Sequence, residues 1–314
     1  MLSFLVRRLA LMGFTLLVVS IAIFGITQLL PGDVATSILG NQATPEDLAT
    51  LREQLGLNRP VVERYLDWLG GIAHGDWGTS LALGTPVGPL LMERLGKSAV
   101  LAAGAIAIGV PLAIALGVGA GLTRGRVPDY LITVGTLVAV SLPEFVTGSA
   151  LIVVFASWLH LLPPSSLVAP GAGLLEMLRS LVLPCLTLTL VMLAHTARMT
   201  RVSMIEVLES SYIRTAVLKG LPWREVVLRH ALRNALLPTI TVIAMNIGWL
   251  IGGLVVVESV FGYPGLGRLL IDAIRNRDVP LIQAIALLVA AIYAFSNLAA
   301  DLLYARLDPR IRYT

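Results

Sequence analysis

The segment YIRTAVLKGLPWREVVLRHALRN, residues 212–234, separates two long apolar stretches and carries five Lys or Arg residues and one acid. Five of its residues recur at the spacing of one helix face: Ile213, Ala216, Val217, Gly220 and Leu221. Gly220 suits the left-handed position that ends a helix, and Pro222 suits the first turn of the next helix. The segment therefore predicts two helices joined by a tight turn.

Composition places this basic segment in a membrane protein. Only 13% of the 314 residues are charged, whereas soluble domains are about 25% charged. The mean hydropathy is +0.85. A span needs about 20 apolar residues, and six stretches qualify: 9–30, 99–122, 131–159, 181–197, 236–257 and 281–303. We therefore predict an all-α polytopic membrane protein with six transmembrane helices.

Two of these stretches differ from a simple transmembrane helix. The first follows Arg7 and Arg8, as a signal peptide would, but its apolar core is too long and no A-x-A-like cleavage site follows. We expect it to remain as a membrane anchor. The third, 131–159, is longer than one span needs, and Pro143 interrupts it. We expect a single tilted or kinked span, because splitting it would leave two half-length helices in lipid.

The Lys and Arg residues predict the orientation. With the N-terminus inside, the inner segments hold 14 of them, against four in the short outer loops. The long outer loop within 31–98 holds five more, but the positive-inside rule has little force in long loops. We therefore expect both termini inside, an extracytoplasmic loop after the first span, and a cytoplasmic loop at 198–235. The expected division is 1–98, with the first span and that loop, and 99–314, with the remaining spans and the cytoplasmic loop.

The outer loop is predicted to contain two short helices. In TPEDLATLREQLG (44–56), Thr44 suits the N-cap, Pro45 the first helical position and Asp47 the third, and Gly56 ends the helix. A second helical piece is PVVERYLDWLGGIAHG (60–75). Small helices on the outer membrane surface satisfy this pattern.

The sequence offers no set of catalytic or metal-binding residues. Gly96-Lys97-Ser98 resembles the end of a Walker A loop, but Leu91 stands where that motif needs glycine. The four histidines are scattered along the chain, at His74, His160, His195 and His230. A single cysteine, Cys185, allows neither an internal disulfide nor a thiolate metal site. We therefore expect no catalytic residue, no metal, no bound cofactor and no enzymatic activity in this chain.

Polar residues in the spans are candidates for the transport path or for a gate. Asn246 and Asn297 lie near mid-span, where they could join helices by hydrogen bonds or line the path. Glu144, Glu258 and Asp301 are acids near span interiors. Glu258 could pair with a basic residue as a gate element, or be a satisfied structural carboxylate. So few ionisable groups favour an energy source outside this polypeptide.

Glycines recur in two of the predicted spans. They are Gly104, Gly109, Gly117, Gly119, Gly121, Gly248, Gly252 and Gly253. Small residues of this kind let helix backbones approach closely in a membrane. We expect close helix packing there, or movement of a gate.

At the basic segment the chain resembles the inner-membrane permeases of binding-protein-dependent ABC importers. Their cytoplasmic loop runs Glu-Ala-Ala, three residues, Gly, nine residues, then Ile-x-Leu-Pro. Here Arg214, Thr215 and Ala216 take the first positions, and Gly220 matches. At the other end His230, Leu232 and Arg233 stand where Ile, Leu and Pro are expected, and the sequence there is similar to the dipeptide/oligopeptide/nickel branch.

Further matches to that branch follow in order along almost the whole chain. They are LLPGDVA, LREQLGLNRPVVERYLDWL, GDWGTSL, VVESVFGYPGLGRLLIDAIRNRDVPLIQ and DLLYARLDPRIR. The resemblance implies a type I importer-like fold in a bacterial inner membrane. It also implies a second related permease, two cytoplasmic ATPases that bind ATP and Mg, and an extracytoplasmic substrate-binding protein.

The resemblance further implies a coupling helix at about 211–221, whose apolar stripe would seat in an ATPase groove. Its residues are Ser211, Tyr212, Ile213, Arg214, Thr215, Ala216, Val217, Leu218, Lys219, Gly220 and Leu221. The lipid bilayer surrounds the spans, and no nucleic-acid partner is expected.

The resemblance implies a permease subunit that forms the translocation path of an ATP-driven importer for di- or oligopeptides or a related small solute, with a nickel chelate or glutathione as the alternative substrate. The alternative from another class is a self-sufficient secondary carrier or membrane enzyme.

Overall fold

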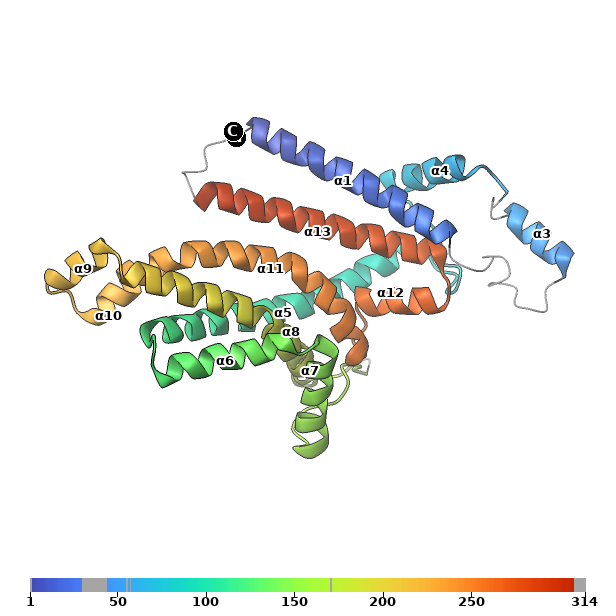
Figure 1. Cartoon of the computed structure of the whole chain (residues 1–314). Helices are drawn as coiled ribbons and strands as arrows, with labels where there is room; N and C mark the ends of the chain where they lie inside the picture. Colours follow the sequence, from blue (N-terminus) through green and yellow to red (C-terminus); the bar gives the residue numbers. More distant parts are fainter. Residues whose placement is uncertain (1, 30–43, 55, 57, 170, 308–314) are drawn as a thin grey trace. The chain divides into compact units, whose positions relative to one another are not determined.

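The computed structural model describes residues 2–29, 44–54, 56, 58–169 and 171–307, and its regular structure is helical apart from one isolated bridge between Thr79 and Pro86 (Figure 1). The long helices are α1 (Leu2–Gln28), α5 (Val87–Leu122), α8 (Leu174–Leu208), α11 (Leu232–Val260) and α13 (Val279–Leu307). Each of these five segments, α11 together with the residues before it, is long and apolar enough to cross a membrane. The prediction of an all-α membrane protein is confirmed.

The third predicted span is broken. It consists of α6 (Val127–Ser141), α7 (Glu144–Leu151) and a π-helix, η1 (Ile152–Trp158), and the pair is bent by 106° at Leu142 and Pro143. Leu142 is extended, with φ −92° and ψ 132°, because the ring of a following proline disfavours helical backbone. The tilted or kinked span expected over 131–159 is therefore either one sharply broken span or a re-entrant pair of helices. The described residues hold five spans, or six if this bent pair counts as one.

Contacts within the chain divide it into two compact units. The first contains residues 1–98 and 264–295, and the second contains 99–263 and 296–314. The first unit thus combines residues from both parts of the division expected from the sequence, and that division stays a prediction.

The first unit contains α1, α3 (Pro45–Gln54), α4 (Val61–Ala73), the start of α5, α12 (Leu266–Arg275) and most of α13. Its apolar core joins α5, α12 and α13 through Leu91, Leu269 and Ile285. An aromatic group of Phe24, Tyr65 and Trp68 packs α4 on α1, with ring centroids 5.5–6.1 Å apart.

Buried polar contacts add to this core. The carboxylate of Asp278 accepts hydrogen bonds from the Ser80 hydroxyl and the Ala82 amide. The Gln283 amide donates to the Thr27 hydroxyl at 2.7 Å, which joins α13 to α1. Because these groups are buried, their hydrogen bonds specify how the elements meet.

The first short helix begins with the predicted cap. Thr44 Oγ1 accepts a hydrogen bond from the Asp47 amide at 3.2 Å, and Asp47 Oδ2 accepts one from the Thr44 amide at 3.2 Å. The side-chain bond from the Thr44 hydroxyl, at 2.6 Å, keeps the pKa of Asp47 below its ordinary value. Gly56 lies after the helix with φ +64°. The predicted helices at 44–56 and 60–75 are both confirmed, as α3 and α4.

The second unit is built around α8. In the most apolar part of α8, 61% of the residues are buried, against 11–33% in the other four long segments. Helix α5 packs along α8. Cys185 Sγ faces the Leu101 carbonyl, and Thr189 Oγ1 donates to the Ala105 carbonyl. Both pairs are 84 residues apart, and this constant offset shows that the two helices run parallel. Helices α6, α7 and α11 also pack on α8.

Glycines set the closeness of the α5–α8 packing. A Cβ added at Gly117 would lie 2.5 Å from Thr200 Cβ, and one at Gly121 would lie 2.7 Å from Met204 Cβ. Both distances are shorter than van der Waals contact, so only glycine fits. The expected close packing is confirmed there. At Gly252 on α11 nothing lies within 4 Å of an added Cβ, so this glycine makes no such close contact within the chain. The alternative reading for it, movement of a gate, stays a prediction.

Candidate functional site

The basic segment forms a corner between α8 and α11. Helix α9 (Ser211–Leu218) follows α8, the chain turns at Gly220 with φ +81°, and α10 (Trp223–Glu225) and the π-helix η2 (Val226–Ala231) lead into α11. In Figure 1, α9 and α10 lie beyond the ends of α8 and α11. The predicted pair of helices with a tight turn is confirmed. Pro222 is the N-cap of α10, one position earlier than expected.

The apolar stripe of α9 is largely turned inward. Ile213 is 2% exposed and Ala216 is 9% exposed. They belong to a core that also contains Met204 of α8 and Val226, Val227, Ala231 and Ala235 of η2 and α11. Ile213 and Ala216 are covered by the chain itself, so the accessible part of α9 lies on its other face. The contact of this helix with an ATPase stays a prediction. A helix linking two long helices must first bury its own apolar face against them.

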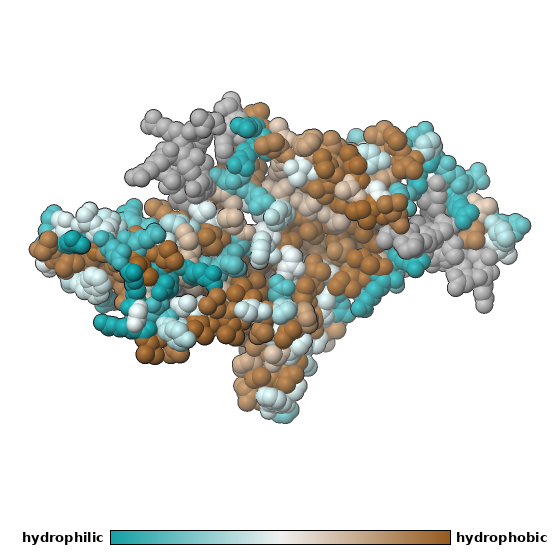
Figure 2. Space-filling view, in the orientation of Figure 1, coloured by the Kyte–Doolittle hydropathy of each residue, from teal (hydrophilic) through white to brown (hydrophobic). Residues whose placement is uncertain are grey.

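The outward face of this corner carries other apolar residues. Leu218 is 82% exposed and Trp223 is 55% exposed, and Tyr212 and Val217 are also exposed. The charged side chains of Arg214, Lys219 and Arg224 are exposed around them. Figure 2 shows the resulting mixture of hydrophobic and hydrophilic atoms at the left of the view, over α9 and α10. We call Tyr212, Val217, Leu218 and Trp223 the outer α9 surface.

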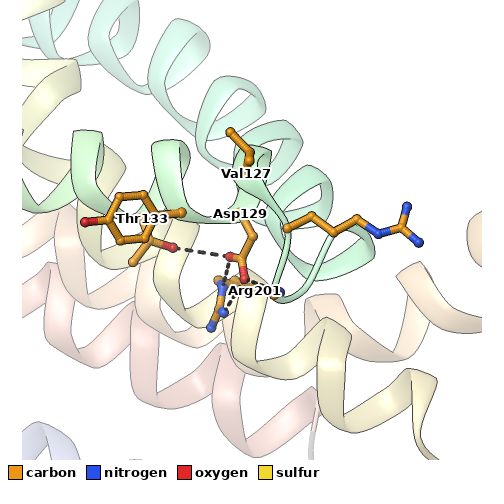
Figure 3. Close-up of a pocket in the computed structure, with 7 residues that line it drawn as sticks. Val127, Asp129, Thr133 and Arg201 are labelled. Atoms are coloured by element: carbon orange, nitrogen blue, oxygen red, sulfur yellow. Dashed lines mark hydrogen bonds and ion pairs between the residues drawn. The ribbon is translucent and has the colours of Figure 1, made fainter.

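A partly buried ion pair joins the start of α6 to α8 (Figure 3). Arg201 of α8 donates to Asp129 Oδ1 from Nε at 2.5 Å and to Oδ2 from a second nitrogen at 2.7 Å. The Gly125 amide and the Thr133 hydroxyl donate to the same carboxylate. These residues line a surface cavity of about 420 Å³, and Arg124 adds an exposed pair to Glu209 at the end of α8.

This ion pair was not predicted from the sequence. Asp129 lies two residues before the predicted span 131–159, so it was not counted among the acids near span interiors. Its position in the first turn of α6, behind a proline, is a recognisable helix-start signal. The pairing itself depends on tertiary structure.

A second group of polar residues meets where α7, α8 and α11 pack together. Glu144 begins α7, His195 lies on α8, and Asn246 and Trp249 lie on α11. All four line one small cavity of about 10 Å³, together with apolar residues. The rings of His195 and Trp249 are 5.9 Å apart and nearly perpendicular, at 76°. We call Glu144, His195, Asn246 and Trp249 the Glu144 cluster.

Two contacts fix this cluster. The Asn246 amide donates to Thr196 Oγ1 on α8 at 3.1 Å. A Cβ added at Gly253 would be 3.4 Å from Glu144 Oε1, so the carboxylate lies directly against the α11 backbone. Of the three residues predicted for a path or gate, only Asn246 lies in this cluster. His195 and Trp249 were missed, although a histidine within an apolar span is itself a signal.

The other two candidates lie elsewhere. Glu258 is fully buried near the end of α11, and Asn297 is half-buried on α13. Burial, followed by the nearby charge of Glu258, raises the pKa of Tyr263 to about 12. Tyr263 therefore stays neutral beside this carboxylate. A gating role for Glu258 or Asn297 stays a prediction.

The structure gives no nucleotide or metal site in the described part of the chain. Gly96, Lys97 and Ser98 lie inside helix α5, so they form no phosphate-binding loop. The Ser98 hydroxyl instead accepts a hydrogen bond from the Leu266 amide at 2.8 Å. Among the described residues no group of three His, Cys, Asp or Glu side chains could hold a metal ion.

Apolar helices long enough to span the membrane, a basic corner between α8 and α11, and a polar cluster where α7 packs on these same two helices define a membrane transport component. Comparison with protein families agrees. Residues 109–313 match the model of the binding-protein-dependent transport system inner membrane component, and residues 1–98 match the N-terminal model for such membrane components. The chain belongs to this family of inner-membrane transport components.

Relatives match along the full length. A probable peptide ABC transporter permease of Sinorhizobium fredii is 38% identical, with 99% of each chain covered. The glutathione transport system permease protein GsiC of Salmonella typhimurium is 37% identical, with 100% of each covered. A crystal structure of an amino acid ABC transporter shares the fold, with a TM-score of 0.52 at 15% identity over 69% of this chain and 94% of that one.

The family fixes the general role of the chain. It is a multi-pass inner-membrane permease subunit of an ABC importer and not an enzyme, as predicted. Membership in a binding-protein-dependent system implies ATPase subunits and a substrate-binding protein as partners. The predicted permease fold is confirmed by the family match and the shared fold.

Proposed function

We propose that this chain forms half of the translocation path of an ATP-driven importer for di- or oligopeptides. Its second half is a related but distinct permease, and two separate ATPases bind ATP and Mg beneath the pair. Full-length similarity to a probable peptide permease supports the substrate class. Both termini and the corner at 198–235 face the cytoplasm, because the seven Lys and Arg residues of 198–235 favour the inner side of the membrane.

The single observation that supports ATPase docking is the outer α9 surface. Leu218, which is 82% exposed, and Trp223, which is 55% exposed, stand on either side of the turn at Gly220 and have apolar area that a partner protein can cover. Exposed Arg214, Lys219 and Arg224 supply charges around it for an acidic groove. We therefore place the docking contact within Ser211–Leu221 on Tyr212, Val217 and Leu218, and extend it to Trp223.

Cysteine cross-linking tests this docking. The sequence has one cysteine, Cys185, which is buried, so a cysteine placed at Leu218 reacts selectively. In membranes that contain the whole complex, Leu218→Cys should form an adduct with an ATPase subunit through a short photoreactive cross-linker. Leu83→Cys is the matched control, since Leu83 is also an exposed leucine, 53% exposed, in the predicted extracytoplasmic loop. ATPase adducts from Leu83→Cys, or none from Leu218→Cys in an intact complex, would refute the docking.

Uptake by the reconstituted complex tests the transport role. Vanadate should abolish dialanine uptake into proteoliposomes, since vanadate blocks ATP hydrolysis by the partner subunits. A chain that transports by itself, driven by an ion gradient and indifferent to vanadate, would instead be a secondary carrier.

A second substrate has a specific observation in its favour. The full-length similarity to a glutathione permease is close to that of the peptide permease, at 37% against 38%. Glutathione is itself a modified tripeptide, so the same uptake assay should include it. A nickel chelate has no comparable support in the described residues, which provide no metal-binding group.

A further inference from the structure

The Glu144 cluster lies on the surface of membrane-spanning helices, where polar side chains are rare. The four residues lie on helices that belong to apolar spans, yet His195 and Trp249 are exposed, and Glu144 and Asn246 are half-buried. Ionisable groups within spans face water or protein, because contact with lipid is costly. This face of the second unit therefore requires an aqueous path or a covering protein.

The electrostatics of the cluster favour a positively charged ligand. Among the described residues, the Glu144 carboxylate forms no hydrogen bond or ion pair, and none of the residues that line its cavity is Lys or Arg. Asn246, fixed by Thr196, adds an amide. The indole of Trp249 is 66% exposed and offers an aromatic face, to which cations are attracted. A free carboxylate, an amide and an exposed indole together suit an ammonium group.

The size of the cavity shows how the cluster would be used. About 10 Å³ holds at most about one water molecule, so a peptide cannot enter it. A ligand instead passes along its open side, where Trp249 and His195 are exposed. The cavity is therefore too small to enclose a ligand, and a ligand could contact the cluster only from this open side.

We propose that the Glu144 cluster is a subsite of the translocation path for the protonated amino terminus of the substrate. Glu144 supplies the countercharge, Trp249 packs against the ammonium group, and Asn246 contributes a polar contact. Peptides and glutathione both carry such an ammonium group. This subsite rests on the proposed function, which supplies the substrate class.

Charge-selective labelling tests the subsite without any substrate. In the reconstituted complex, Trp249→Cys is treated with a cationic and with an anionic methanethiosulfonate reagent. The cationic reagent should react faster by about tenfold, since a cleft of one charge concentrates the opposite one. Adding Glu144→Gln should remove this preference. Ile247→Cys, two residues away on another side of α11 and exposed, is the control and should show no preference that depends on Glu144.

Uptake of dialanine by the same complexes provides the second measurement. Glu144→Gln should lower uptake at least about tenfold, and Glu144→Asp should restore part of it because the charge returns. Glu176→Gln, which removes an exposed carboxylate at the start of α8, should leave uptake at the wild-type rate. Complex assembly is followed by co-purification, so that loss of uptake is not confused with loss of the complex.

The possible failures are distinguishable. If the wild-type complex takes up neither dialanine nor glutathione, the proposed function is refuted. The labelling of Trp249→Cys still shows in that case whether the cluster attracts cations. Labelling at Trp249→Cys that is absent, or indifferent to reagent charge, overturns the subsite. If removing a basic residue of the second permease restores uptake in the Glu144→Gln complex, the subsite is also overturned, because Glu144 would then pair with that residue of the partner subunit.

Discussion

Gly220 shows how one residue shapes the corner between α8 and α11. Its φ is +81°, and nothing lies within 4 Å of an added Cβ, so only the backbone conformation restricts the residue type. A side chain in the left-handed region costs about 1–2 kcal/mol. Gly220→Val should therefore weaken co-purification of the ATPases and dialanine uptake while membrane insertion stays normal.

The control at this position is Gly220→Asn, because asparagine adopts left-handed backbone more readily than valine. Its effect should be clearly smaller than that of valine. Equal and complete retention of uptake and assembly by both variants would show that the turn conformation does not matter for coupling.

Tyr263 is predicted to make stability depend on alkaline pH. Its pKa is about 12 in the folded protein against an ordinary 10, because burial disfavours the phenolate. Above pH 10 the unfolded chain loses this proton while the folded chain keeps it, so the free energy of unfolding should fall as pH rises toward 12. Thermal unfolding should show that the stability of the Tyr263→Phe variant depends less on pH in this range than the stability of the wild type does. Identical slopes would contradict the burial of this phenol.

At the scale of elements, the α5–α8 contact is predicted to tolerate no side chain at Gly117. A Cβ there would collide with Thr200 and with the Ala197 carbonyl, at 2.5 and 2.6 Å. Gly117→Ala should lower the free energy of unfolding by about 1–3 kcal/mol, as overpacking does. Gly252→Ala, with open space around it, should be neutral or slightly stabilising. Thermal unfolding in detergent compares the two, and equal behaviour would mean that α5 and α8 do not pack this closely.

The Asp129–Arg201 pair is predicted to stabilise the junction of α6 and α8. Asp129 is almost fully buried, so removing one partner leaves an uncompensated charge and should cost about 3 kcal/mol. Asp129→Asn combined with Arg201→Gln should cost less than the sum of the single changes. Arg124→Ala breaks the exposed pair with Glu209 and should cost less than about 1 kcal/mol. If the double change costs as much as the two single changes together, a direct interaction between Asp129 and Arg201 is excluded.

At the scale of the whole molecule, the expected orientation can be measured directly. Lys219→Cys should react with a membrane-impermeant thiol reagent only after the membrane is opened, because the corner is expected inside. Arg64→Cys, on α4 in the predicted outer loop, should react in intact spheroplasts. The reverse pattern would invert the proposed topology.

Much of this molecule followed from sequence patterns. Hydropathy identified the long helices, Thr44 and Asp47 marked the start of α3, and Gly220 marked the turn after α9. What escaped prediction depends on tertiary contacts. A stripe on α9 has the same pattern whether it faces its own chain or a partner, and the pairing of Asp129 with Arg201 joins residues 72 positions apart. The break at Leu142 and Pro143 was visible as a proline but not as a bend of 106°.

The inward face of α9 has an evolutionary consequence. Ile213 and Ala216 share one core with Met204, Val226 and Ala231, so a change of volume at one of these positions must be compensated inside the same gene. Val217 and Leu218 point away from that core, and on the proposed docking their compensating changes arise in the gene for an ATPase subunit. Neighbouring positions on one short helix should therefore covary with different proteins.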